Sequence, residues 1–354
     1  MENTNAEKIK TKRNKKEQSV FVRKLTGADN MTGKSDYLLC LFTLALVSIG
    51  LIMVFSASYY DSISRFGTPY HFLIRQFIWI IGGTVAFFVG ASFDYHHFSN
   101  KKLAIGLAAL AILLLVLVVY SPLGLTLNNA TRWLKCGPIT IMPGEITKLC
   151  VIVFTAWFLS DNPERIRKVF TGLLPLAALT VIYAALICKQ PNLSTAITIV
   201  LIVGCMMIVA GLHRLWILFS FAAGIGGIAW FVTFRKDSYQ YERVMSFLDP
   251  FQYESGAGYQ VCQSLTGIGN GGLFGVGLGK SVEKTLYLPE PQNDFILTII
   301  AEETGFVGVM VLMAIYAGFL WRGVHIAMRA RDRFGIYLAS GIVLMVIIQV
   351  ILNT

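Results

Sequence analysis

Long, uninterrupted apolar runs constrain the fold of this chain more than any other feature of the sequence. Most of the nine runs approach the ~20 residues that an α-helix needs to cross a bilayer. Residues 146–159 form the weakest of them, because that run is short and carries Lys148. Only 14% of the residues are charged, against about 25% in soluble domains. We therefore predict an all-α polytopic membrane protein with nine transmembrane helices, at 37–57, 73–92, 103–120, 146–159, 170–188, 193–209, 215–234, 295–321 and 336–352.

Lysine and arginine predict how these helices are oriented. Basic side chains crowd residues 1–35 and recur near Lys101, Lys168, Arg214 and Arg329. The positive-inside rule places such segments on the cytoplasmic side of the membrane, so the N-terminus is predicted to be cytoplasmic. The net charge of +10 is then explained by the membrane topology and by contact with anionic lipid. We therefore expect no nucleic-acid partner.

This orientation divides the chain into two parts. Residues 1–35 are polar, basic and poor in aromatic side chains, which predicts a disordered cytoplasmic tail. Residues 36–354 form the transmembrane domain. Within it, residues 235–294 make a large extracellular loop between helices 7 and 8, and residues 121–145 and 189–192 also face outward. Because the polar residues gather in these outer segments, we expect the functional site to be external.

The strongest candidate for chemistry is Asp294, at the mouth of the eighth apolar run. It belongs to the segment Leu-Pro-Glu-Pro-Gln-Asn-Asp-Phe at 288–295, and carboxylates are seldom placed near hydrocarbon without a function. The large loop contains no histidine, so an acid–base step there would require a carboxylate, for which Asp294 and Glu290 are the candidates. The structural alternative is that Asp294 caps the following helix.

Two further features of this region have open interpretations. Glu302 and Glu303 lie deeper in the same apolar run, about 12 Å below Asp294 at ~1.5 Å per residue, so at least one should face a polar cavity or a basic partner. The glycines between Gly267 and Gly279 could bring backbone N–H groups to a phosphate, or they could form flexible turns over the membrane surface.

The first outer loop supplies basic candidates. Arg132 precedes a Met-Pro-Gly-Glu segment in which Glu145 and Lys148 are three residues apart, so they share a helix face. One interpretation is a Glu–Lys pair that neutralises itself. The other is a lysine that binds a phosphate near Asp294, because a lysine inside an apolar span needs an anion or a cavity.

Taken together, these motifs resemble the SEDS family (shape, elongation, division and sporulation), and most closely its FtsW and sporulation branch. The resemblance covers nearly all of the membrane region from Asp36 onward. The Pro-Gln-Asn-Asp wording at 291–294 is closer to that branch than to RodA. The motifs that carry it are Ser56-Ala57-Ser58, residues 128–133, Pro143-Gly144-Glu145 with Lys148, residues 190–193, 247–250, 256–260, Gln263-Ser264, 288–295 and Glu302-Glu303.

The resemblance implies a peptidoglycan glycosyltransferase that polymerises lipid II on the outer face of the bacterial cytoplasmic membrane during cell division. Asp294 falls on the family's catalytic position. We expect Glu145, Lys148, Arg132, Arg243 and Glu290 to bind substrate, with Lys148 and the two arginines on the pyrophosphate of the undecaprenyl-linked glycan. A divalent cation (Mg²⁺ or Mn²⁺) there is left open, and no organic cofactor is expected.

The resemblance also implies protein partners, and two alternative functions remain open. We expect a class B penicillin-binding protein and other divisome membrane proteins as partners, at the division septum. The alternatives are a lipid II flippase, which uses the same substrate without making a bond, and a non-enzymatic divisome scaffold.

The sequence departs from the family pattern in three places. Gly144 stands where serine is usual, and Asn192 where aspartate is common, so no carboxylate role is expected at position 192. The family has ten spans, so a chain that stops at Thr354 after nine is expected to be truncated at its C-terminus.

Overall fold

A computed structural model describes residues 36–127, 130–137, 139–218, 245–246, 248–254, 256, 258–285 and 287–353. Three predictions fall outside these residues: the tail at 1–35, Arg243, and most of the seventh apolar run at 215–234.

Helices occupy the other eight predicted spans. Seven of the described segments are long and apolar enough to cross a membrane, and one of these joins a π-helical turn, η4, to α6. The remaining helix, α7, is shorter, with 17 residues. The helices are α2 (Tyr37–Phe66), α3 (His71–Ser92), α4 (Lys101–Tyr120), α5 (Pro143–Asp161), η4 (Val169–Leu173), α6 (Leu174–Cys188), α7 (Leu193–Val209), α12 (Ile296–Arg329) and α13 (Arg333–Asn353), with short 3₁₀ turns η2 (Tyr95–Ser99) and η3 (Arg165–Arg167).

The ends of the spans follow from local chemistry. Asp36 caps α2, because its carboxylate accepts a hydrogen bond from the Leu39 N–H at 3.1 Å, and Asn100 caps α4 in the same way. Gly67 ends α2 in the left-handed region, at φ 71°, which glycine adopts without strain. Between such ends an apolar run forms a helix, because lipid offers its backbone groups no other hydrogen-bond partners.

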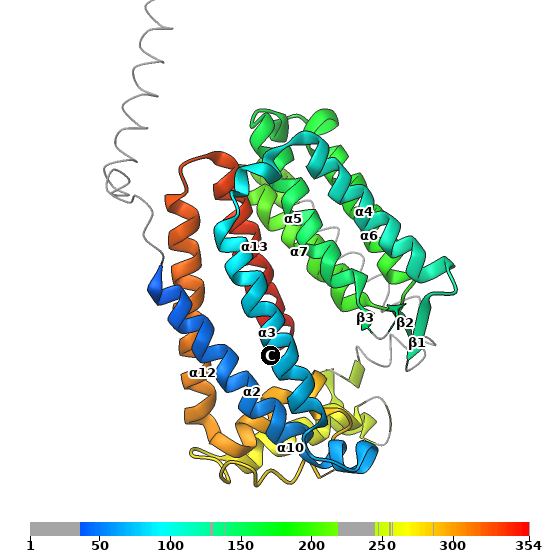
Figure 1. The fold of residues 1–354 in the computed structure, drawn as a ribbon, viewed down its shortest axis with the longest axis vertical. Coiled ribbons are helices and arrows are strands. Elements are labelled where there is room, and N and C mark those ends of the chain that lie inside the picture. Colours follow the sequence, from blue (N-terminus) through cyan, green and yellow to red (C-terminus); the bar gives the residue numbers. More distant parts are fainter. Residues whose placement is uncertain are drawn as a thin grey trace, which may run out of the picture.

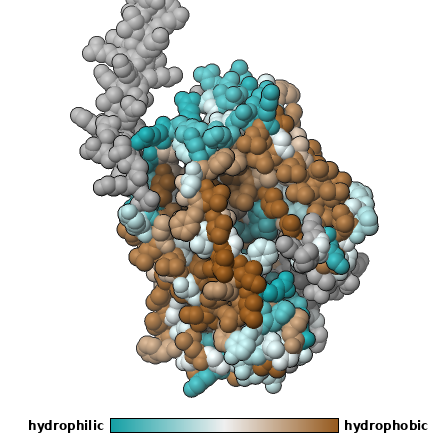
Figure 2. All heavy atoms as spheres, in the orientation of Figure 1, coloured by the Kyte–Doolittle hydropathy of each residue, from teal (hydrophilic) through white to brown (hydrophobic). Residues whose placement is uncertain are grey.

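The spans form two groups joined by one helix (Figure 1). In one group α12 packs against α2, and α3 packs on α2; in the other α4, α5, α6 and α7 pack together. Helix α13 contacts α12 on one side and both α5 and α7 on the other. Apolar side chains cover the middle of the molecule and polar ones gather toward its two ends (Figure 2), as expected for a protein that spans a bilayer.

A small antiparallel sheet between α4 and α5 was not predicted. Strands β1 (Gly124–Leu127), β2 (Ala130–Cys136) and β3 (Ile139–Ile141) pair in the order β1-β2-β3, with an irregularity between Leu125 and Thr126. The strands are too short for a clear period-2 pattern in the sequence. Strand β2, which carries Arg132, contacts both α4 and α5.

The large loop is more ordered than its composition suggests. Its described part contains η5 (Pro250–Tyr253), α10 (Tyr259–Gly271) and α11 (Pro291–Asp294). Helix α10 packs along α12, and α11 contacts both α2 and α12. These contacts fix the segment that carries Asp294 to the group formed by α2 and α12.

Candidate functional site

Helix α12 is broken near its N-terminal end, and the glycine-rich segment fills the break. Gly305 has φ 68° and ψ −171°, so the helical hydrogen bonds stop there. The groups set free are paired with the loop: Val276 N donates to Glu302 O (2.9 Å), Gly277 N to Glu303 O (3.0 Å), Phe306 N to Gly272 O (2.9 Å) and Val307 N to Leu273 O (3.1 Å). A membrane protein requires such pairing, because a free backbone group in an apolar environment costs several kcal/mol.

Neither interpretation of these glycines from the sequence describes residues 271–277. The N–H groups of Val276 and Gly277 are bonded to α12, so they are not available to a phosphate, and the segment is fixed rather than a free turn. Glycine is needed for close approach: a Cβ on Gly271 would lie 2.1 Å from Ala301 O, and one on Gly275 2.1 Å from Glu303 O.

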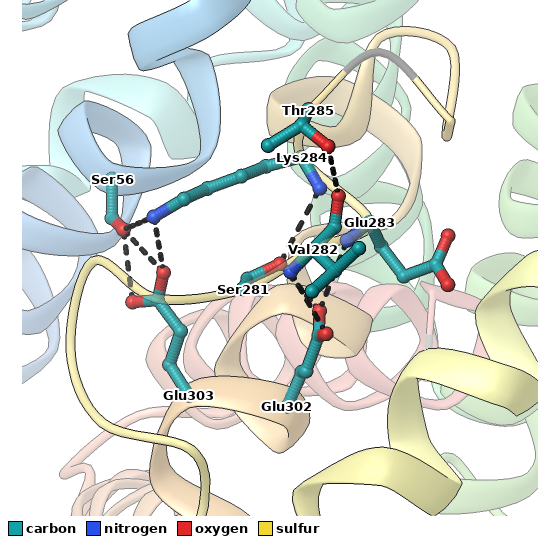
Figure 3. Close-up of polar contacts among 8 residues, drawn as sticks. All are labelled: Ser56, Ser281, Val282, Glu283, Lys284, Thr285, Glu302 and Glu303. Atoms are coloured by element: carbon teal, nitrogen blue, oxygen red, sulfur yellow. Dashed lines mark hydrogen bonds and ion pairs between the residues drawn. The ribbon is translucent and has the colours of Figure 1, made fainter.

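Glu302 and Glu303 are fully buried beside this break and have different partners (Figure 3). Glu303 forms an ion pair with Lys284, at 2.6 Å, which confirms the expectation of a basic partner for one of the two acids. Glu302 accepts a hydrogen bond from the Ser281 hydroxyl. Roles for Lys284 and Ser281 were not predicted from the sequence, because neither residue belongs to a local pattern and both contacts join segments distant in sequence.

Helix α11 packs on the C-terminal end of α2 through polar side chains. The amide of Gln292 donates to the buried carboxylate of Asp61 at 3.0 Å, and Arg65 pairs with the same carboxylate at 2.7 Å. Arg65 also reaches Glu290 at 3.5 Å. Asp61 and Arg65 were not predicted from the sequence, although their i, i+4 spacing at the end of an apolar run is a signal that could have identified them.

Asp294 differs from its neighbours in α11. Asn293 donates to Glu290 at 3.1 Å, whereas the Asp294 side chain is exposed and its carboxylate has no hydrogen bond or ion pair within the described residues. The N-cap of α12 is Phe295, without a side-chain cap. The capping alternative for Asp294 therefore does not hold in this structure.

Glu145 and Lys148 pair on the first turn of α5. The Lys148 Nζ lies 2.7 Å from Glu145 Oε2, and the lysine side chain is 3% exposed whereas that of the glutamate is 52% exposed. This is the self-neutralising pair that the spacing allowed. An ammonium has three N–H donors, and Glu145 is the only partner of Lys148 in the described part of the chain, so two donors stay open.

Arg132 projects from β2 toward the segment before α7. Its Nη2 donates to the carbonyl of Pro191, while its Nε is buried without a hydrogen-bond partner among the described residues. Asn192 caps α7 by accepting from Thr195 N at 3.3 Å, which suits an amide at this position. Arg132 thus also retains an unfilled donor.

The predicted site residues fall into two sets. One contains Glu290 and Asp294, beside the C-terminal end of α2 and the N-terminal end of α12; the other contains Arg132, Glu145 and Lys148, between the C-terminal end of α4 and the first turn of α5. No hydrogen bond or ion pair links the two sets in the described ranges. Over the same ranges, no group of three or more His, Cys, Asp or Glu side chains could hold a metal ion.

Comparison with known proteins decides the family. Residues 36–354 match the profile of the FtsW, RodA and SpoVE proteins, described as "Cell cycle protein". The chain belongs to this family. These are the SEDS proteins that the motifs resemble.

Curated members of the FtsW/RodA/SpoVE family are similar over most of the chain. Stage V sporulation protein E of Bacillus subtilis is 38% identical over 90% of this chain and 86% of its own length. The probable peptidoglycan glycosyltransferase FtsW of Trichlorobacter lovleyi is 35% identical over 90% of this chain and 82% of its own length. The resemblance to the FtsW and sporulation branch is thus confirmed.

Solved structures confirm the polytopic fold of the FtsW/RodA/SpoVE family. A chain from a study of how a peptidoglycan synthase complex coordinates polymerization and crosslinking has a TM-score of 0.73 at 28% identity, over 90% of this chain and 85% of that chain. The rod shape determining protein RodA of Thermus thermophilus has a TM-score of 0.60 at 25% identity, over 89% of this chain and 83% of its own.

Proposed function

We propose that this chain is a peptidoglycan glycosyltransferase that polymerises glycan strands from lipid II on the outer face of the cytoplasmic membrane during cell division. Its curated relatives include several named as probable peptidoglycan glycosyltransferases. The observation that supports this mechanism is the exposure of the Asp294 side chain and its lack of hydrogen-bond partners among the described residues. Asp294 is exposed beside a membrane span while Gln292 and Asn293 are bonded to protein.

The proposed step is a displacement at an anomeric carbon. The carboxylate of Asp294 takes the proton from a sugar hydroxyl of the acceptor, lipid II. The oxygen of that hydroxyl forms a bond to the anomeric carbon of the lipid-linked donor glycan. The bond from that carbon to the pyrophosphate breaks, and undecaprenyl pyrophosphate leaves with the bonding electrons. A general base of this kind typically contributes on the order of 10²–10⁴-fold in rate.

The second set of residues would stabilise the departing pyrophosphate. Among the described residues, Lys148 has two open N–H donors beside Glu145, and Arg132 has a buried Nε without a partner. Phosphate oxygens would satisfy both, and charge-assisted hydrogen bonds are the strong ones. Glu290, which is bonded to Arg65 and Asn293, would support the substrate pocket near Asp294. Arg243 is proposed from the sequence alone.

A divalent cation is proposed only as a companion of the pyrophosphate. Because no cluster of ligand side chains exists among the described residues, the phosphate oxygens would have to supply most of its ligands, with at most a carboxylate such as Asp294 from the protein. Mg²⁺ commonly binds in this way, through one or two carboxylates plus substrate phosphates. No step above depends on the cation.

A related chain belongs to a peptidoglycan synthase complex that coordinates polymerization and crosslinking. We therefore propose that this chain also works with a crosslinking partner, a class B penicillin-binding protein, among other divisome membrane proteins at the septum. The N-terminus would be cytoplasmic and the site extracellular.

The test is polymerisation of lipid II by purified full-length protein, with and without the penicillin-binding partner. Asp294→Asn keeps the shape of the side chain but removes its basicity, so this variant should fold, bind its partner and make essentially no polymer. Glu254→Gln is the matched control, because Glu254 is exposed on the same outer loop, and it should be fully active. Glu290→Gln should keep part of the activity.

Normal polymer from the Asp294→Asn protein would contradict the proposed mechanism. Transport of lipid II by a wild-type protein that makes no polymer would leave a flippase as the better account. Loss of partner binding by Asp294→Asn would show that the substitution acts through assembly rather than chemistry.

A further inference from the structure

A buried ion pair joins the loop that carries Asp294 to two membrane helices. Lys284 Nζ lies 2.6 Å from Glu303 Oε1 of α12 and 3.0 Å from Ser56 Oγ of α2. The Ser56 hydroxyl in turn donates to the Glu303 carboxylate, at 2.7 and 2.8 Å. Loop, α2 and α12 therefore meet at one charge-assisted network (Figure 3).

The lysine of this network is enclosed. The Lys284 side chain is 2% exposed and that of Glu303 is 0% exposed, so both charged groups of the pair are enclosed by protein. This separates Lys284 from Lys148, whose partner Glu145 is half exposed. Lys284 also donates to both a carboxylate and a hydroxyl of the protein, whereas Lys148 has a single partner among the described residues.

The neighbouring glutamate fixes the same turn from the other side. The Glu302 carboxylate accepts from Ser281 Oγ, from Val282 N at 2.9 Å and from Glu283 N at 3.4 Å. Consecutive residues of α12 thus bind both ends of the four-residue turn 281–284. In the backbone, the residues just before this turn fill the break at Gly305.

The same loop makes further fixed contacts just before Asp294. Leu288 is buried, and its N–H donates to Glu283 O at 3.0 Å. Gln292 then binds Asp61 of α2 at 3.0 Å. The chain from 281 to 292 is therefore held at both ends, and Asp294 lies two residues beyond Gln292, with no side-chain partner among the residues that the structure describes.

We propose that Lys284 and Glu303 are positioning residues for the polymerase reaction: their buried ion pair, shared with Ser56, sets the place of Asp294 relative to α2 and α12. This inference rests on the proposed function of Asp294. The pair binds no substrate. Its effect on rate comes from geometry, because a displacement of about 1 Å at a catalytic group can cost on the order of 100-fold.

The test compares single and double substitutions. Lys284→Met leaves the Glu303 carboxylate buried without its cation, and Glu303→Gln leaves the ammonium without its anion, so each single variant should polymerise lipid II on the order of 100-fold more slowly. In Lys284→Met/Glu303→Gln both charges are gone and the amide can still bond Ser56. Removing both partners of a buried pair is often neutral, so the double variant should recover at least tenfold over the singles.

Hydrogen exchange of the purified protein separates positioning from substrate binding. The single variants should exchange faster in peptides covering 272–294 and 302–307, and the double variant should return to the wild-type pattern. Lys280→Met is the matched control, since Lys280 is exposed in the same loop, and it should change neither rate nor exchange.

Other outcomes overturn the proposal. If the double variant is as slow as Lys284→Met while its exchange is normal, Lys284 acts on the substrate. If the single variants exchange as wild type does, the pair does not hold the loop. If wild-type protein makes no polymer, the proposed function fails, and the exchange data still decide whether the pair orders the segment.

Discussion

Two buried lysines of this protein illustrate how the surroundings of a charge determine the role proposed for it. Lys148 and Lys284 are both enclosed by protein and both pair with a glutamate. They differ in the partner: Glu303 is fully buried and also bonded to Ser56, whereas Glu145 is half exposed and is the only partner of Lys148 among the described residues. The same residue type thus serves a proposed anion site in one place and a proposed structural tie in the other.

This difference predicts the behaviour of Lys148. Lys148→Ala should lower polymerisation about 10- to 100-fold without preventing membrane insertion, since a hydrogen bond to a charged group contributes about 1.5–3 kcal/mol. Lys148→Arg should rescue only partly, because a planar guanidinium differs from a compact ammonium. Rates and apparent affinity for lipid II are the measurement. A wild-type rate for Lys148→Ala would leave only the self-neutralising pair with Glu145.

The buried residue Glu283 predicts how the stability of the protein depends on pH. Glu283 is 4% exposed, and its Oε2 has no partner in the described part of the chain. Its carboxylate points away from the Lys284 ammonium (Figure 3). Burial, and next the Glu302 charge, raise the pKa of Glu283 above its usual 4.5.

The folded protein therefore keeps a proton on Glu283 at pH values where the unfolded chain has lost it. Stability contributed by this group is complete below about pH 4.5 and declines as pH rises toward the raised folded pKa. Glu283→Gln should remove that decline, so the variant should be as stable as wild type at low pH and more stable at neutral pH. Thermal unfolding in detergent across pH is the measurement, and an unchanged pH dependence would contradict the assignment.

At the level of elements, the break in α12 is the feature that the sequence did not reveal. The length of the apolar run predicted α12, because a long apolar segment in lipid can satisfy its backbone hydrogen bonds only as a helix or in a closed barrel. It could not predict Gly305 as a break, since an isolated glycine is tolerated inside a helix. Nor could it predict that residues 272–277 fill the break, because that depends on contacts between segments distant in sequence.

Matched glycines on α10 test this packing. Gly271→Ala would place a Cβ 2.1 Å from Ala301 O, whereas the corresponding Cβ at Gly269 meets nothing within 4 Å. Gly271→Ala should lower the free energy of unfolding by about 1–3 kcal/mol through overpacking. Gly269→Ala should be neutral or stabilising by up to about 1 kcal/mol, since alanine favours helices over glycine. Equal stability of the two variants would show that α10 does not pack on α12 as described.

At the scale of the whole molecule, the sequence predicted the spans better than it predicted the site. Eight spans follow from hydrophobicity, whereas the seventh, at 215–234, lies largely outside the described residues. For the site, the sequence singled out Asp294, Glu145 and Lys148. It could not show that Asp294 and Lys148 belong to different helix groups, because only packing through α13 fixes how those groups are related.

The orientation of the whole molecule is the remaining prediction from charge, and two exposed positions test it. Tyr287 lies in the large loop and Lys102 at the start of α4, and both side chains are exposed. If the basic segments are cytoplasmic, a membrane-impermeant thiol reagent on intact cells should label Tyr287→Cys and not Lys102→Cys. Opening the cells should expose Lys102→Cys.

The two cysteines should be introduced into a chain in which the exposed cysteines of the described residues, Cys40 and Cys188, and also Cys136 are replaced by serine. Labelling of Lys102→Cys in intact cells, with Tyr287→Cys protected, would reverse the topology. Asp294 would then face the cytoplasm, away from the external lipid II that the proposed reaction requires. Because Asp294 and Tyr287 belong to the same loop held on α2 and α12, this one comparison tests the orientation and the placement of the proposed catalytic residue together.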